Sequence, residues 1–212
     1  IGKNKYIFIL GWNTNIVQII MVKLWIISPG GVGCTYFIDH LNKYGIITNK
    51  SNNYDGLKHF KSPPLNINSH KFLFDCDAII YLVRHPQEIV ESHFRRRWGS
   101  KQSGILGGTC KSNTFSEYLN SGDAENDSFG INNHFESWIN NNLSLPFYVF
   151  DLKTINLIPQ ILDKICNCTV QPIDLKESKC RSRGIKYYEE LWIKFQQHID
   201  SSLDKLELNT NQ

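Results

Sequence analysis

Residues 77–98 read Asp77-Ala-Ile-Ile-Tyr-Leu-Val-Arg-His-Pro-Gln-Glu-Ile-Val-Glu-Ser-His-Phe-Arg-Arg-Arg-Trp98. Residues 78–83 form an apolar run rich in β-branched and aromatic residues, the pattern of a strand buried on both faces. Arg84 follows at the carboxyl end of this strand, and Pro86 suits the first turn of a helix. The side chains that then share one face at helical spacing are Ile89, Val90, His93, Phe94 and Arg97. The stretch therefore predicts a buried strand, an arginine and a helix in direct succession.

Arg84 stands where a phosphate ligand is expected. In open α/β sheets, ligands bind outside the carboxyl ends of the strands, and an arginine fork there holds a phosphate with two hydrogen bonds. The alternative is an arginine that only ends the strand and pairs with Glu88 or Glu91 of the following helix. This segment alone leaves both interpretations open.

A second predicted strand leads into a glycine-rich turn. Residues 22–27 are mostly apolar, and they run into Ser28-Pro-Gly-Gly-Val-Gly-Cys-Thr35, after which helical spacing begins. Glycines let backbone N–H groups approach an anion closely, and the amino end of the new helix adds partial positive charge. The turn is not a Walker A loop, because Cys34 stands where that motif has its lysine. It predicts a phosphate cradle, and a Gly-Gly turn without a ligand is the alternative.

Together, the two segments resemble the motifs of sulfotransferases that use 3′-phosphoadenosine-5′-phosphosulfate (PAPS). In that family the first strand leads into a loop of the form Pro-(Lys/Arg)-Ser-Gly-Thr-Thr around the 5′-phosphosulfate, and residues 31–35 are similar to it at Gly33 and Thr35. The second family motif has an arginine at the end of a strand and a serine eight positions later, both on the 3′-phosphate. Arg84 and Ser92 have this spacing.

Further segments follow in the order of the family. His59, ahead of a Pro-Pro pair, resembles the histidine that acts as general base. Residues 129–138 resemble the helix with His and Trp that precedes the next strand, and residues 146–153 resemble the strand that commonly ends in Tyr-Glu-Asp-Leu. Residues 181–184 are similar to the late Arg-Lys-Gly element that closes over the nucleotide. The resemblance thus runs from about residue 22 to about residue 191.

The chain also departs from the family pattern at two positions. Gly31 stands where many members place a lysine or arginine that stabilises charge on the leaving phosphate, and Val149 stands where the tyrosine of Tyr-Glu-Asp-Leu would be. The nearest candidates for a replacement cation are Lys58, Arg95 and Arg96.

The resemblance implies a three-layer α/β/α fold with a central parallel sheet, of the P-loop-like sulfotransferase architecture. It implies transfer of a sulfuryl group from PAPS, without a metal, to a hydroxyl of a carbohydrate, lipid or small alcohol. His59 and Lys58 would be catalytic. The implied cofactor-binding residues are Gly30, Gly31, Val32, Gly33, Cys34, Thr35, Arg84, Ser92, Arg183 and Gly184. The alternatives are a catalytically impaired nucleotide-binding protein of the same fold, a small-molecule phosphotransferase and, for His59, an ordinary loop histidine.

Composition favours one soluble domain. The chain has 212 residues, of which 41% are hydrophobic, and a net charge of +3. This balance suits a polyanionic cofactor but falls short of the basic face of a nucleic-acid binder. The Arg95–Arg97 run has two interpretations, contact with an anionic partner or a helix face exposed to solvent. We expect a single domain over residues 21–212, with residues 1–20 an upstream extension, because the only methionine is Met21.

The cysteine pattern and the remaining segments complete the expectations. The six cysteines lack zinc spacing and are typical of reduced thiols in a cytosolic protein. No uninterrupted apolar run reaches the roughly 18 to 20 residues of a membrane helix. Helices are expected over residues 155–166 and 185–206 and a strand over residues 147–150, with surface loops over residues 99–113 and 120–128.

Overall fold

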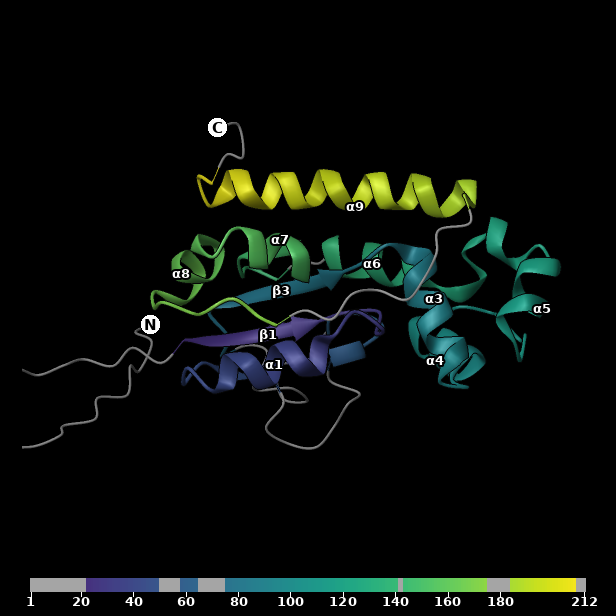
Figure 1. Ribbon diagram of the computed structural model, residues 1–212, viewed down its shortest axis with the longest axis horizontal. Helices are drawn as coiled ribbons and strands as arrows, with labels where there is room; N and C mark the ends of the chain where they lie inside the picture. The colour runs from purple at the N-terminus through teal and green to yellow at the C-terminus, as the bar shows by residue number, and fades with distance from the viewer. Residues whose placement is uncertain (1–21, 50–57, 65–74, 141–142, 175–183, 209–212) are drawn as a thin grey trace, which may run out of the picture.

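The computed structural model describes residues 22–49, 58–64, 75–140, 143–174 and 184–208. Residues 1–20, the expected extension, lie outside these ranges. The centre is a four-stranded sheet in the order β2-β1-β3-β4, and every neighbouring pair is parallel (Figure 1). The strands are β1 (Lys23–Ile27), β2 (Ile47–Thr48), β3 (Ala78–Val83) and β4 (Phe147–Asp151). The expected α/β class with a central parallel sheet is confirmed.

The predicted strand after residue 77 is the centre of the fold. All six residues of β3 are buried, because β1 and β4 flank it and helices cover both faces of the sheet. Its register pairs Ile79 with Trp25 on one side and with Phe147 on the other. A parallel strand covered on both faces is apolar at every position rather than alternately, and the sequence has this pattern.

Helices form a layer on each side of the sheet. In Figure 1, α1 (Cys34–Asn42) lies below it, and α6 (Ile131–Ile139), α7 (Leu152–Leu157), α8 (Gln160–Cys166) and α9 (Lys186–Lys205) lie above it. Beyond the carboxyl ends of the strands lie α3 (Pro86–Arg95), α4 (Gly99–Leu106) and α5 (Phe115–Asn120). The expected terminal helix is α9, and the arrangement is consistent with the expected three layers.

The expected helix over residues 155–166 is wrong as a single element. The chain forms α7 and α8, separated at Ile158 and Pro159. Proline has no N–H to donate and disfavours helical dihedrals in the residue before it, and Ile158 has φ −123° and ψ 77°. The helix after β3 is also shorter than its apolar spacing indicates, because it ends at Arg95, and Arg97 lies beyond it at φ 62°.

The expected loop over residues 99–113 is also wrong in its first half, which forms α4. Its glycines and serines disfavour a helix, but contacts distant in sequence hold it in place. Gln102 and Ser103 donate to the carbonyls of Pro29 and Ser128. Gly99 packs so closely on Phe94 that a Cβ would lie 2.4 Å from that ring. Residues 120–128 form two short 3₁₀ turns, Asp123–Glu125 and Asp127–Phe129.

Five of the six cysteines are described, and all five are free thiols. Cys34, Cys76, Cys110 and Cys166 are buried and Cys168 is exposed, whereas Cys180 lies outside the described residues. Among the helices that the structure describes, none has the length and apolar character needed to cross a membrane.

Candidate functional site

The strand order places a switch point between β1 and β3. The chain leaves β1 towards β2 on one side of the sheet, and it continues from β3 to β4 on the other side. Ligands of open α/β sheets bind outside the carboxyl ends of strands at such a point. Both arrows end at the same edge of the sheet in Figure 1. The glycine-rich turn follows β1 at this edge and Arg84 follows β3, so the two predicted phosphate motifs meet where the topology favours a ligand.

The glycine loop, residues 28–33, packs tightly against α3. Gly30, Gly31 and Gly33 have φ values of 88°, 70° and 89°, a left-handed conformation that only glycine adopts easily. A Cβ on Gly31 would lie 3.2 Å from the carbonyl oxygen of Ile89 and 3.3 Å from Cβ of Ser92. A lysine or arginine at position 31 would therefore meet both backbone strain and close contacts.

Buried polar side chains hold the glycine loop in place. Ser28 Oγ accepts from the Gly30 N–H at 3.2 Å, and Gln102 Nε2 donates to the Pro29 carbonyl at 3.0 Å. The His93 ring lies under Gly30, where a Cβ would come within 2.7 Å of its Nε2. Burial first, and then the charges of His59 and Arg96, lower the pKa of His93 to about 4. His93 is therefore neutral at pH 7.

Lys58 brings a cation to this loop from another part of the chain. Its Nζ donates to the hydroxyl of Thr35, in the first turn of α1, at 2.6 Å, although the residue is only 8% exposed. The Lys58 carbonyl also accepts from the Ser28 N–H at 2.9 Å. The loop amides, the amino end of α1 and the ammonium group thus concentrate positive charge in one place. Arg95 and Arg96, the other candidates, are exposed at the far end of α3.

His59 is held by the same loop. Its Nδ1 lies 2.8 Å from the Ser28 carbonyl oxygen and 3.4 Å from Ser28 Oγ. A carbonyl only accepts, so Nδ1 carries the proton and the lone pair of the neutral ring is on Nε2. This tautomer is the one that a general base working through Nε2 requires.

Arg84 and Ser92 have different neighbours in the structure. Arg84 Nε forms an ion pair with the Glu88 carboxylate, one turn into α3, and the arginine side chain is 35% exposed. Pairing with Glu88, the alternative to phosphate binding, is therefore present in this state. Ser92 is 3% exposed and lies beside Gly31 of the loop.

The other predicted cofactor residues are in part described. Val32 and Cys34 are each 4% exposed and belong to the core, so any contact with a ligand comes from their backbone. Arg183 lies outside the described residues. Gly184, at φ 66°, leads into α9, where Glu189 Oε2 lies 3.4 Å from His85 Nε2. This contact brings the start of α9 next to the end of β3.

A buried pair that sequence reasoning missed supports the segment of Lys58 and His59. Tyr81 of β3 and Nδ1 of His134 share a hydrogen bond of 2.6 Å, and burial lowers the pKa of His134 to about 3. One turn further along α6, Trp138 Nε1 donates to the Phe60 carbonyl at 2.7 Å. An aromatic in a buried strand and a histidine in a helix gave no local signal of this pairing.

No family model, curated protein or solved structure matches the chain. Among the described residues, no group of three histidine, cysteine or acidic side chains is placed to hold a metal ion. The chemistry of the site is therefore argued from its own geometry.

Proposed function

We propose that this chain is a sulfotransferase that moves a sulfuryl group from PAPS to a hydroxyl acceptor. The observation that carries the proposal is the buried Lys58 ammonium on Thr35, beside a glycine loop at the switch point of a parallel sheet. A cation beside a glycine loop and the amino end of a helix favours an anionic group there. Lys58 also supplies the cation that the loop lacks, because Gly31 stands where the family pattern has a lysine or arginine.

In this proposal the loop amides and Lys58 hold the 5′-phosphosulfate. As the bond between sulfur and the phosphate oxygen breaks, negative charge grows on that oxygen, and a preorganised cation there lowers the barrier. Thr35 adds a hydroxyl donor. Its position in the first turn of α1 lets the same anion gain from the helix amino end.

His59 acts as general base in the same step. The acceptor hydroxyl oxygen forms the new bond to sulfur, its proton passes to Nε2 of His59, and 3′-phosphoadenosine-5′-phosphate (PAP) leaves with the electron pair. The hydrogen bond from Nδ1 to the Ser28 carbonyl keeps the ring in the required tautomer. His59→Asn should then lose transfer while it retains PAP binding.

For the 3′-phosphate, the proposal assigns Arg84, Ser92 and the segment of Arg183 and Gly184. Arg84 must exchange its Glu88 partner for the phosphate. A dianionic phosphate competes well with one carboxylate for a guanidinium, because it accepts two charge-assisted hydrogen bonds at once. Ser92 lies beside Gly31 and is only 3% exposed, so its contact with the phosphate needs a local rearrangement there.

The first test is calorimetric titration of the purified chain with PAP, ATP and AMP. The expected result is micromolar binding of PAP that weakens by about 10-fold to 100-fold in Lys58→Gln, the loss of one charge-assisted hydrogen bond. Lys43→Gln, an exposed lysine beyond the other end of α1, is the matched control and should bind normally. If PAP binds no better than AMP, or Lys58→Gln binds as well as Lys43→Gln, the proposal is wrong.

The Arg84–Glu88 ion pair favours one competing function, a nucleotide-binding protein of this fold without transferase activity. Transfer of ³⁵S from labelled PAPS to a library of carbohydrate, lipid and small-alcohol acceptors separates the two. Labelled product that disappears in His59→Asn supports the enzyme. Intact PAP binding with no labelled product across the library supports the binding protein.

A further inference from the structure

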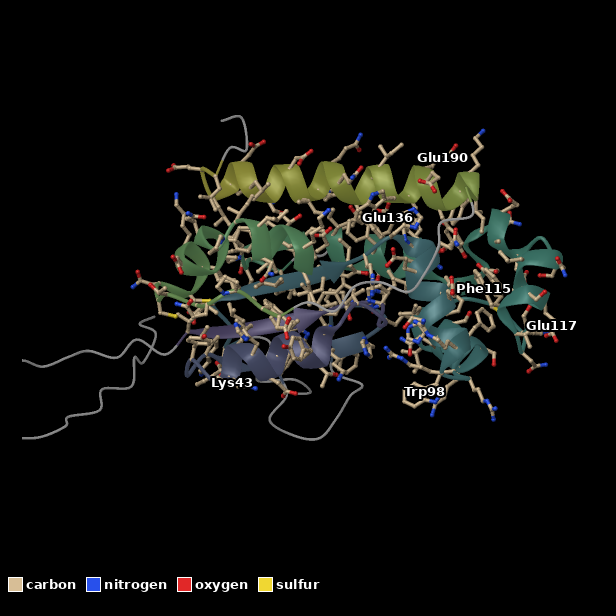
Figure 2. All side chains as sticks on the ribbon, viewed as in Figure 1. Lys43, Trp98, Phe115, Glu117, Glu136 and Glu190 are labelled. Atoms are coloured by element: carbon tan, nitrogen blue, oxygen red, sulfur yellow. The ribbon has the colours of Figure 1, made fainter. Side chains whose placement is uncertain are left out.

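A basic and aromatic surface lies where α3 gives way to α4. We call it the α3–α4 corner. It consists of Arg95, Arg96, Arg97, Trp98, Lys101 and Ile105, all of them exposed. Trp98 is 52% exposed and Ile105 is 40% exposed, so apolar surface lies beside the basic side chains. Figure 2 shows Trp98 projecting from the lower edge of the molecule, away from α9.

The α4 part of the corner is held in place by hydrogen bonds on other residues of the same helix. Gln102 and Ser103 hold α4 to the carbonyls of Pro29 and Ser128. Spacings of three and four residues then place Trp98, Lys101 and Ile105 next to one another, and all three are exposed. The Lys101 ammonium lies 5.9 Å from the centre of the Trp98 ring, so charge and apolar surface are adjacent.

The four cations of the corner are not neutralised within the described structure. No described acidic side chain forms an ion pair with any of the three arginines or with Lys101. Glu91, one helical turn before Arg95, is the acidic residue nearest in sequence, and it is half-buried. The positive field is therefore available to a partner.

Backbone strain is present at the centre of the corner. The Trp98 N–H donates to the His93 carbonyl and the Arg97 N–H donates to the Phe94 carbonyl, each at 2.9 Å. This is a Schellman ending of α3, which places Arg97 in the left-handed conformation where glycine is usual. An arginine at a position that favours glycine is compatible with a use for its charge.

We propose that the α3–α4 corner binds the surface of a membrane rich in anionic phospholipids. The arginines and Lys101 would contact the headgroups, and Trp98 and Ile105 would enter the boundary between headgroups and acyl chains. Arginine and lysine beside tryptophan are typical of interfacial attachment. A soluble polyanion would account for the cations but not for Ile105, since an exposed aliphatic side chain gains from an apolar environment, which a polyanion does not offer. The inference does not rest on the proposed sulfotransferase function, because it uses none of the site residues.

The test is sedimentation of the full chain with phosphatidylcholine vesicles that contain either no phosphatidylserine or 30% of it. Binding should require the anionic lipid. Loss of one basic residue should weaken the partition coefficient about fivefold in Arg95→Gln and in Arg97→Gly. Trp98→Ala should weaken it roughly tenfold, and this loss should persist at high salt because it is apolar.

Arg97→Gly also separates binding from stability. It relieves the left-handed strain, so the variant should be at least as stable as the parent in thermal unfolding and yet bind more weakly. Lys153→Gln on α7 and Ile193→Ala on α9 remove a matched charge and a matched apolar group above the sheet, and both should bind normally.

Three results would overturn the inference. The first is no sedimentation with phosphatidylserine vesicles. The second is equal binding by the corner variants and the two controls. The third is binding that heparin or an oligonucleotide abolishes and that Trp98→Ala leaves unchanged, which would assign the corner to a soluble polyanion.

Discussion

Acidification from pH 7 to pH 5 should destabilise this protein strongly, and two buried histidines are the reason. The pKa is lowered to about 4 for His93 and to about 3 for His134, in both cases mainly by burial. An unfolded histidine titrates near pH 6.5, so below that pH the unfolded chain binds protons that the folded chain excludes. Stability is therefore complete above about pH 7 and falls as the pH drops.

The magnitude follows from the two pKa differences. At pH 5, each histidine costs about 2 kcal/mol of unfolding free energy relative to neutral pH, so the pair costs about 4 kcal/mol. This is a large share of the 5 to 15 kcal/mol that is typical for a domain. It corresponds to a lower melting temperature by roughly 8 to 15 °C for a chain of this size. Most carboxyl groups titrate below this window and contribute little to it.

The assay is urea unfolding followed by circular dichroism at half-unit steps from pH 7.5 to pH 5. His93→Gln should reduce the loss of unfolding free energy between pH 7 and pH 5 by about 2 kcal/mol, whatever its stability at pH 7.5. A parent protein equally stable at pH 7 and pH 5, or a loss in His93→Gln equal to that of the parent, would refute the reasoning.

Three further substitutions probe the site. Gly30→Ala combines a left-handed φ with a contact of 2.7 Å to the histidine ring below it, so it should lose about 2 kcal/mol in urea unfolding and weaken PAP binding in calorimetry. Tyr81→Phe leaves a buried nitrogen of His134 without its partner and should lower the unfolding free energy by about 1 to 3 kcal/mol. Glu88→Gln releases Arg84 and should tighten PAP binding severalfold, whereas unchanged affinity would mean that Arg84 does not reach the nucleotide.

The strands were predictable from the sequence because their signal is local. A run such as residues 78–83 is apolar at every position, and a buried parallel strand has no other requirement. The break between α7 and α8 was also written in the sequence, at Pro159, but the apolar spacing on both sides outweighed it in the prediction. Helix α4 was not predictable in this way. Its glycines favour a loop, and the bond from Gln102 to Pro29 that holds it spans 73 residues.

In the candidate site, too, the local features were predictable and the contacts between distant residues were not. The glycine turn and the arginine at the end of β3 are local features, and both are where the patterns indicate. Partners are not local features. The sequence left two interpretations of Arg84 open, an ion pair with a glutamate of the next helix and a bond to a phosphate. The structure shows the ion pair with Glu88. The packing of Ser92 against Gly31 could not be predicted either. Helical spacing shows which residues share a face of the helix, but it does not show which segment packs on that face.

Gly31 and Lys58 are best understood as two parts of one arrangement. The loop lies so close to α3 that a side chain at position 31 would press on the Ile89 carbonyl and on Ser92. A cation built into the loop would have to push the loop off the helix. Lys58 comes from a separate segment of the chain, and its ammonium donates to Thr35 while its carbonyl accepts from Ser28. A tightly packed loop is thus compatible with a cation supplied from outside it, and the missing loop lysine is a reason to examine Lys58 rather than to discount the site.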